Sequence, residues 1–135
     1  MSARNTLALP ETLRQQMLEH ALAAPREEVC GLVAGRDRTP VRYYPVANDA
    51  PDRARRFCMN PREQIDAMRR MRAAGEDLLG IFHSHPEATA DPSATDLHLA
   101  SYPGTIYFIA SLAASPPDLR AFHYDGATFH EMRLR

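Results

Sequence analysis

The residues best suited to chemistry lie between positions 83 and 96, where two histidines, a serine and an aspartate are close together in the sequence. His83 and His85 are separated by one residue, and in an extended strand residues i and i+2 point to the same side. Both imidazoles could therefore face one point, which is an arrangement suited to a metal ion. Asp96 is the natural third ligand, since zinc binds imidazole nitrogen and carboxylate oxygen and keeps one position open for water in catalytic sites.

Each of these residues also has a simpler explanation when it is taken alone. His83 could be a strand-end histidine that bonds to the backbone. Ser93 could be only an N-cap and Asp96 only an acid of the first helical turn, because Ser-x-x-acid is typical of a helix start. Glu87 and Asp91 lie in the same loop and could compete with Asp96 as a ligand. The metal hypothesis gains its weight from the whole group, since all its members lie in or beside one loop.

A further carboxylate, Glu28, lies far upstream at the start of the apolar run 29–33. A carboxylate that enters a buried strand costs free energy unless it has a partner. A solvated acid at a strand start is the simpler explanation, and it is the better one for the neighbouring Glu27. A metal site that activates water needs a base nearby, however, and a carboxylate outside the ligand set is the usual choice. Glu28 is therefore the candidate base.

The spacing of apolar residues predicts three helices that would support these side chains. The first lies between Pro10 and Pro25, with apolar residues on one face. The second starts at the N-cap Asn60 and ends before Gly75, which is placed as a C-terminal cap. The third is short and covers residues 93–100.

Short apolar runs between these helices predict a set of strands. They lie at residues 29–34, 41–46, 57–59, 78–83, 105–111, 119–124 and 127–134. Asp125-Gly126 separates the last two strands and is typical of a tight hairpin turn. This order of elements predicts an α/β fold of the α+β type, with a single curved mixed β-sheet flanked by helices.

Length and composition exclude several classes of protein. The chain of 135 residues has the size of one domain, which we expect to span residues 1–135. A formal net charge of -1 argues against binding nucleic acid through bulk electrostatics, and no apolar run is long enough to cross a membrane. Residues 1–5 lack the apolar run of a secretory signal, and Cys30 and Cys58 are too few for a disulfide framework. We therefore expect a cytoplasmic protein with two free thiols.

The candidate residues together resemble the signature of the JAMM (MPN) zinc metallopeptidase family. The signature positions are Glu28-Val29-Cys30-Gly31, His83-Ser84-His85-Pro86, Ser93 and Asp96, with seven residues from Pro86 to Pro92. The resemblance runs over nearly the whole chain, and the spacing of its positions is highly specific. It implies a Zn²⁺ ion held by His83, His85 and Asp96, a zinc-bound water activated by Glu28 as general base, and an oxyanion stabilised by Ser93. It also implies the family fold, with cytidine-deaminase-like layering.

Within that family the chain resembles the compact stand-alone bacterial members that process sulfur-carrier proteins. The resemblance implies hydrolysis of a peptide or isopeptide bond after the C-terminal glycine of a ubiquitin-like or sulfur-carrier protein with a Gly-Gly tail. Only eight residues separate Asp96 from Thr105, which leaves no room for the insertions with which eukaryotic relatives hold ubiquitin chains. A strand end beside a proline-bearing loop would suit an extended tail along a sheet edge.

The alternative function is a metal-free MPN-type scaffold domain that only binds protein partners. Relatives of that kind typically lose one or more ligand positions, whereas this chain keeps them all. The sequence leaves open the oligomeric state, the exact substrate, and whether a cysteine, a short peptide or an isopeptide-linked group is released.

Overall fold

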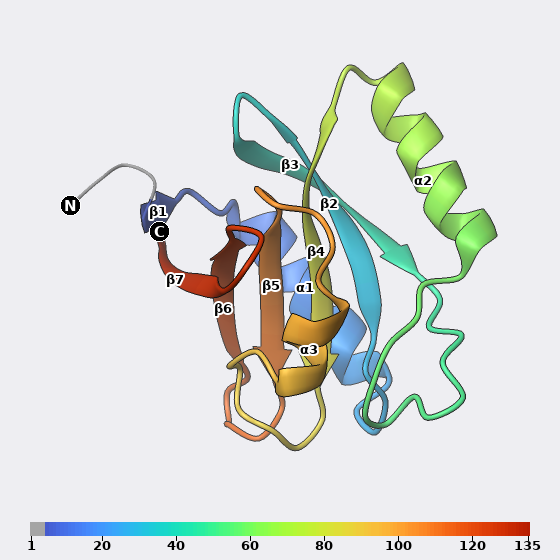
Figure 1. The fold of residues 1–135 in the computed structure, drawn as a ribbon, viewed down its shortest axis with the longest axis vertical. Helices are drawn as coiled ribbons and strands as arrows, with labels where there is room; N and C mark the ends of the chain where they lie inside the picture. The colour runs from blue at the N-terminus through green and yellow to red at the C-terminus, as the bar shows by residue number, and fades with distance from the viewer. Residues whose placement is uncertain (1–4) are drawn as a thin grey trace.

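The structure is a computed structural model, which describes residues 5–135 (Figure 1). Residues 1–4, which belong to the segment in which we expect no secretory signal, lie outside the described residues. Across residues 5–135, every helix is too short or too polar to span a bilayer.

Within the described residues, the strands form one mixed sheet in the order β1-β7-β6-β5-β4-β2-β3. The strands are β1 (Thr6–Leu7), β2 (Cys30–Arg36), β3 (Thr39–Val46), β4 (Asp77–His85), β5 (Ile106–Ser111), β6 (Asp118–Tyr124) and β7 (Phe129–Leu134). The helices are α1 (Glu11–Ala23), α2 (Pro61–Ala73) and α3 (Ala94–Leu99). β4 pairs in parallel with β5 and antiparallel with β2. This single sheet flanked by helices confirms the predicted α+β class.

The two long helices cover opposite faces of the sheet (Figure 1). The apolar side of α1, including Met17, packs into a core with Val33 of β2 and Phe82 of β4. The buried side of α2, including Met71, packs with Leu32, which neighbours Val33 on the same strand. Because successive residues of a strand face opposite sides, these contacts place α1 and α2 on different faces.

Strand β4 carries both histidines of the candidate site, because it extends to His85, two residues beyond the predicted apolar run. Phe82 faces α1, so His83 and His85 face the other side of the sheet, where α3 lies (Figure 1). β2 and β5 flank this strand, and its end is bonded further by Ser84 to Val29. An extended tail therefore has no free edge at β4 to pair with, which corrects the expectation of a tail laid along a sheet edge at the histidines.

Three local features differ from the sequence-based expectations. Residues 57–59 do not form a strand; within that stretch only Met59 pairs, through an isolated bridge to Asn48. The short edge strand β1 has no counterpart among the predicted strands, since two residues carry no detectable period. The last turn is wider than a two-residue hairpin, because the Asp125 N–H donates to the Thr128 carbonyl and β7 begins only at Phe129.

The glycine of the Glu-x-x-Gly signature has a packing role. The Tyr43 ring lies directly over Gly31, so that a Cβ at this position would collide with the ring. Tyr43 is held there by a 2.6 Å bond between its hydroxyl and His20 Nδ1, and its ring meets Phe82 edge-on. Gly31 therefore lets β3 and α1 pack closely against the start of β2, immediately beyond Glu28.

Candidate metal centre

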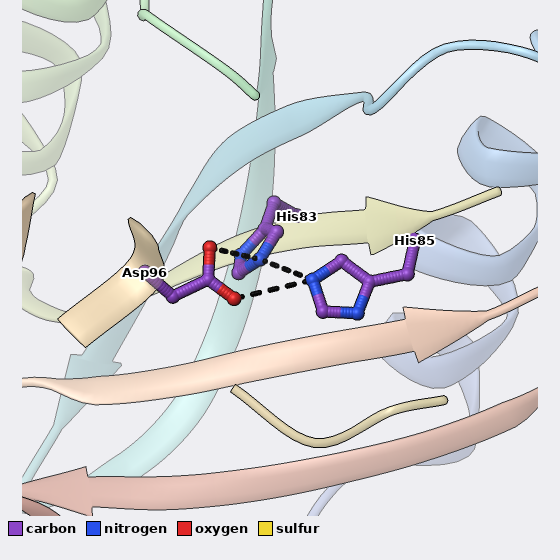
Figure 2. Close-up of side chains that lie close together, drawn as sticks. All are labelled: His83, His85 and Asp96. Atoms are coloured by element: carbon purple, nitrogen blue, oxygen red, sulfur yellow. Dashed lines mark hydrogen bonds and ion pairs between the residues drawn. The ribbon is translucent and has the colours of Figure 1, made fainter. Parts of the chain in front are cut away.

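Strand β4 and the start of α3 bring His83, His85 and Asp96 together in a buried cluster (Figure 2). The Nε2 atom of His83 lies 3.1 Å from Asp96 Oδ1 and 3.1 Å from His85 Nε2. The Nε2 atom of His85 lies 3.2 Å from Asp96 Oδ2. These are the three side chains that the sequence nominates as ligands, and the fold gathers them at one point.

The geometry of the cluster fits a zinc ion. Zinc–ligand bonds of about 2.0–2.1 Å in a tetrahedron place neighbouring ligand atoms about 3.3–3.4 Å apart. The distance between the two histidine Nε2 atoms, 3.1 Å, is close to that edge length, and each of these nitrogens has one Asp96 oxygen at a similar distance, His83 with Oδ1 at 3.1 Å and His85 with Oδ2 at 3.2 Å. Two imidazole nitrogens and one carboxylate oxygen are also a usual ligand set of a catalytic site, in which the fourth position stays open.

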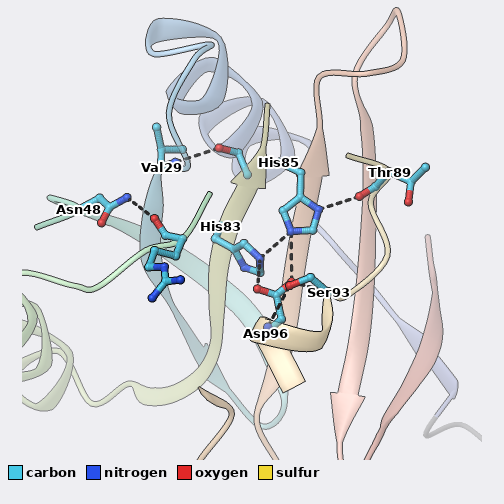
Figure 3. Close-up of polar contacts among 9 residues, drawn as sticks. Val29, Asn48, His83, His85, Thr89, Ser93 and Asp96 are labelled. Atoms are coloured by element: carbon cyan, nitrogen blue, oxygen red, sulfur yellow. Dashed lines mark hydrogen bonds and ion pairs between the residues drawn. The ribbon is translucent and has the colours of Figure 1, made fainter. Parts of the chain in front are cut away.

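Two of the three side chains are oriented by further hydrogen bonds to the backbone (Figure 3). His85 Nδ1 donates to the Thr89 carbonyl at 2.7 Å, so Nε2 is the ring nitrogen that faces the cluster. Asp96 Oδ2 accepts from the Ser93 N–H at 2.8 Å, while Ser93 Oγ accepts from the Asp96 N–H at 3.0 Å. This reciprocal capping box starts α3 and aims the Asp96 carboxylate at the histidines.

His83 is held in a different way, which the sequence did not indicate. Its ring is fully buried, and its Nδ1 atom has no hydrogen-bond partner within residues 5–135. The Phe57 ring stacks on it instead, with centroids 4.6 Å apart and planes 25° from parallel. The sequence predicts a strand at Phe57, and no local signal links this residue to one 26 positions later.

The charges of the cluster depend on one another. Burial lowers the pKa of His83, so this imidazole is the neutral one. Burial also acts against a charged His85, but the bonds to Asp96 and Thr89 outweigh it and raise the pKa of His85. Burial likewise disfavours a charged Asp96, yet the two histidines hold the pKa of Asp96 well below its usual range. The carboxylate is therefore ionised, and a bound cation would take the place of the proton on His85.

Glu28 lies beside this cluster and outside the ligand group. The Val29 N–H donates to Ser84 Oγ at 2.9 Å, and the Glu28 N–H donates to the Arg53 carbonyl, which fixes the start of β2. The Glu28 side chain is buried, and its Oε1 atom has no hydrogen-bond partner within the described residues. Burial raises the pKa of Glu28 to about 7. A buried carboxylate with an unused oxygen and a pKa near neutrality is suited to exchange a proton.

Two cavities lie on either side of the cluster. One, of about 670 Å³, is lined by polar groups that include Glu28, His85 and Ser93. The other, of about 330 Å³, is lined by His83 and Asp96 together with apolar side chains such as Phe57 and Tyr107. A chain that passes from one cavity to the other would cross the cluster and Glu28.

The competing candidates lie outside the cluster. Asp91 accepts from the Thr89 hydroxyl at 3.0 Å and pairs with Arg120, while Glu87 is exposed on the rim of the larger cavity. Among residues 5–135, only His83, His85 and Asp96 form a group of three or more potential ligand side chains with ligand atoms within 4.8 Å of one another.

Comparison with known proteins gives consistent matches over nearly the whole chain. The family model described as prokaryotic homologs of the JAB domain matches residues 10–125. A desampylase of Haloferax volcanii is 37% identical, over 95% of this chain and 94% of that protein. The CysO-cysteine peptidase of Mycobacterium tuberculosis is 32% identical, over 93% of this chain and 88% of that protein.

Solved structures match as well. Protein DSY2949 of Desulfitobacterium hafniense has a TM-score of 0.86 at 38% identity and covers 96% of this chain and 91% of its own. AF2198, a JAB1/MPN domain protein of Archaeoglobus fulgidus, has a TM-score of 0.60 at 18% identity and covers 99% of both chains. The second likeness concerns the fold alone.

Proposed function

Because this chain belongs to the prokaryotic JAB-domain family, we propose that residues 1–135 form a single zinc metallopeptidase domain of the JAMM (MPN) type. One observation carries the proposal: His83, His85 and Asp96 form a buried group whose ligand atoms all lie within 4.8 Å of one another, with the buried Glu28 beside them. These three side chains would hold the ion. When bound there, zinc would lower the pKa of a water molecule and polarise the substrate carbonyl.

Glu28 is the proposed general base and Ser93 the proposed hydrogen-bond donor. The Glu28 carboxylate would take a proton from the attacking water and pass it to the leaving amine nitrogen, so that the amide bond breaks and the carboxylate is restored. Ser93 Oγ accepts from the Asp96 N–H and so keeps its own proton to donate to the carbonyl oxygen as charge develops there. Both residues line the same cavity.

Replacing Ser93 with alanine should give a folded but slow enzyme. The loss of an oxyanion donor costs about 10²–10³ in turnover, and the loss of the helix cap costs about 0.5–2 kcal/mol of stability. The control is Asn60→Ala, which removes the cap of α2 away from the cluster and should lower stability while turnover stays normal. Thermal melting and kcat separate the two effects. A Ser93→Ala enzyme that is less stable but fully active would leave Ser93 with the capping role alone.

We further propose that the substrate is a ubiquitin-like or sulfur-carrier protein with a Gly-Gly tail. The similarity to a CysO-cysteine peptidase supports this substrate class. The two cavities support an extended tail that crosses the end of β4, where the backbone of the tail would have to approach the buried cluster closely. Glycine suits such a place because it has no side chain and lets the backbone come close.

Mass spectrometry of a carrier extended by a cysteine or a short peptide after Gly-Gly tests this substrate. We expect cleavage after the last glycine. A carrier with Ala-Ala in place of Gly-Gly should be cut at least about tenfold more slowly, since one extra methyl group in a close-fitting site costs about 1–3 kcal/mol. Equal cleavage of both tails, or cleavage of neither by the zinc-loaded protein, would refute the substrate and leave the metal centre standing.

We also propose that the protein works in the cytoplasm. Its two cysteines, the buried Cys30 and the exposed Cys58, are both free thiols. A reducing compartment keeps an exposed thiol such as Cys58 in that state.

A further inference from the structure

The side chain of Asn48 uses its full hydrogen-bonding capacity near the cluster, and Figure 3 draws one of its bonds. Its Nδ2 atom donates to the carbonyls of Glu28 and Arg56, at 2.8 and 3.0 Å. Its Oδ1 atom accepts from the backbone N–H groups of Ala50 and Cys58, at 2.9 and 3.0 Å. An amide has two donor protons and two acceptor lone pairs, so every one of them is engaged. One side chain thus joins the start of β2 to the segment 47–60 that follows β3.

Two of these bonds fix the backbone on either side of Phe57. Arg56 and Cys58 are both bound to Asn48, and the ring between them stacks on His83. His85 is oriented by its bond to Thr89, but His83 Nδ1 has no such bond within residues 5–135. On the side away from Asp96, the His83 ring is therefore held by Phe57, and Asn48 helps to hold the backbone on either side of Phe57.

The other link of Asn48 fixes the backbone of the proposed base. The Glu28 carbonyl accepts from Asn48 Nδ2, and the Glu28 N–H donates to the Arg53 carbonyl of the same segment. Because Glu28 Oε1 has no partner within the described residues, no bond to that atom directs the carboxylate. Its direction follows from its backbone and its packing, and hence from the same 47–60 segment.

We propose that Asn48 is a positioning residue of the hydrolytic centre, which holds Glu28 and, through Phe57, His83 in one arrangement. Asn48 would act on the reaction only through these two residues. The role toward Glu28 rests on the proposed function, whereas the role toward Phe57 and His83 concerns the fold of the site and stands without it. A displacement of about 1 Å at a reacting group can cost about 10² in rate.

The main variant of the test changes a single group of Asn48. Asn48→Asp keeps the Oδ1 acceptor for Ala50 and Cys58, but it turns the two-proton donor into an oxygen that faces two carbonyls. The matched control is Asn60→Asp in the same segment, which keeps the cap oxygen for Glu63 and, like Asn48→Asp, turns an amide donor into an oxygen that faces an acceptor, here the exposed Asp49 carboxylate. Phe57→Leu is the second variant, since it removes the stacked ring and leaves Asn48 intact.

Nuclear magnetic resonance of the metal-free protein measures the stacking of Phe57 on His83 without any substrate. The carbon-bound protons of His83 lie over the Phe57 ring, so they should be shifted upfield in the wild type and in Asn60→Asp. The upfield shift should be lost in Asn48→Asp, in which the Phe57 ring is still present but no longer held. A wild-type protein without the upfield shift would overturn the proposal before any variant is made.

Kinetics and metal affinity complete the test. In Asn48→Asp we expect kcat to fall about 10²-fold with little change in KM, while Asn60→Asp should behave as the wild type. Phe57→Leu should lower zinc affinity, measured against a chelator, about 10–100-fold, as other supports of metal ligands do. An Asn48→Asp protein that folds and keeps both the His83 shift and kcat would overturn the proposal. If that variant does not fold, unchanged zinc affinity in Phe57→Leu would overturn it. Absence of peptidase activity in the wild type would refute the proposed function instead, and the His83 shift would still decide the role of Asn48.

Discussion

Glu28→Gln should leave the fold and the metal in place and remove nearly all turnover. The amide has the shape of the carboxylate but cannot take a proton from water, and the loss of a general base costs about 10²–10⁴ in rate. Because Glu28 Oε1 has no hydrogen-bond partner within residues 5–135, the substitution breaks no bond at that atom. The measurement is kcat together with zinc content and a thermal melt.

The raised pKa of Glu28 predicts how the stability of this variant differs from that of the wild type as the pH changes. An acid whose pKa rises from 4.5 to about 7 on folding binds its proton more tightly in the native state. The stability that this proton contributes is present at low pH and is lost as the pH rises through that window. In the metal-free protein above pH 7, Glu28→Gln should therefore melt at a higher temperature than the wild type.

The neighbouring residue supplies the control for Glu28. Glu27 is only half-buried and forms a surface ion pair with Arg53 at 3.1 Å, which is worth about 0–1 kcal/mol. Glu27→Gln should therefore change neither turnover nor stability appreciably. If Glu28→Gln remained active within a few-fold of the wild type, Glu28 would be structural and the reaction would need another base.

The parts of the fold that the sequence predicted are those with a local pattern. The apolar side of α1 shows a helical spacing, and its residues Leu13, Met17 and Ala21 are buried as expected. The cap at Asn60 and the proline after it mark the start of α2 correctly. The alternation of β4 likewise predicts that His83 and His85 face one side, because a strand has a period of two residues.

The contacts that complete the site are not local, which is why sequence patterns did not reveal them. The stacking of Phe57 on His83 joins segments 26 residues apart, and Asn48, which follows β3, bonds to Glu28, which precedes β2 and lies 20 residues earlier. The periodicity of hydrophobic residues predicts helices and strands, but it does not predict which loop packs on which strand. The family resemblance names residues that carry chemistry, whereas Asn48 and Phe57 contact those residues from the side and lie outside its signature.

Asp96→Ala should remove most of the metal from a protein that otherwise purifies with about one zinc per chain. The substitution takes away one of three candidate ligands and the carboxylate on which both histidines converge. It also removes half of the capping box of α3, because the Ser93 N–H loses its acceptor. Elemental analysis of the purified protein measures the zinc content directly.

Two further variants separate the metal ligand from the helix cap and from the competing acids. Asp96→Asn keeps an oxygen that can accept from the Ser93 N–H but loses the negative charge, so we expect α3 to be retained and zinc to be lost. Glu87→Ala removes an exposed carboxylate on the rim of the same site and should keep full zinc. Full zinc in Asp96→Ala would exclude Asp96 from the ligand set. A wild-type protein that binds no metal even when zinc is supplied would favour the alternative of a scaffold that only binds partners. In that case His83, His85 and Asp96 would be a buried polar cluster held together by the proton on His85.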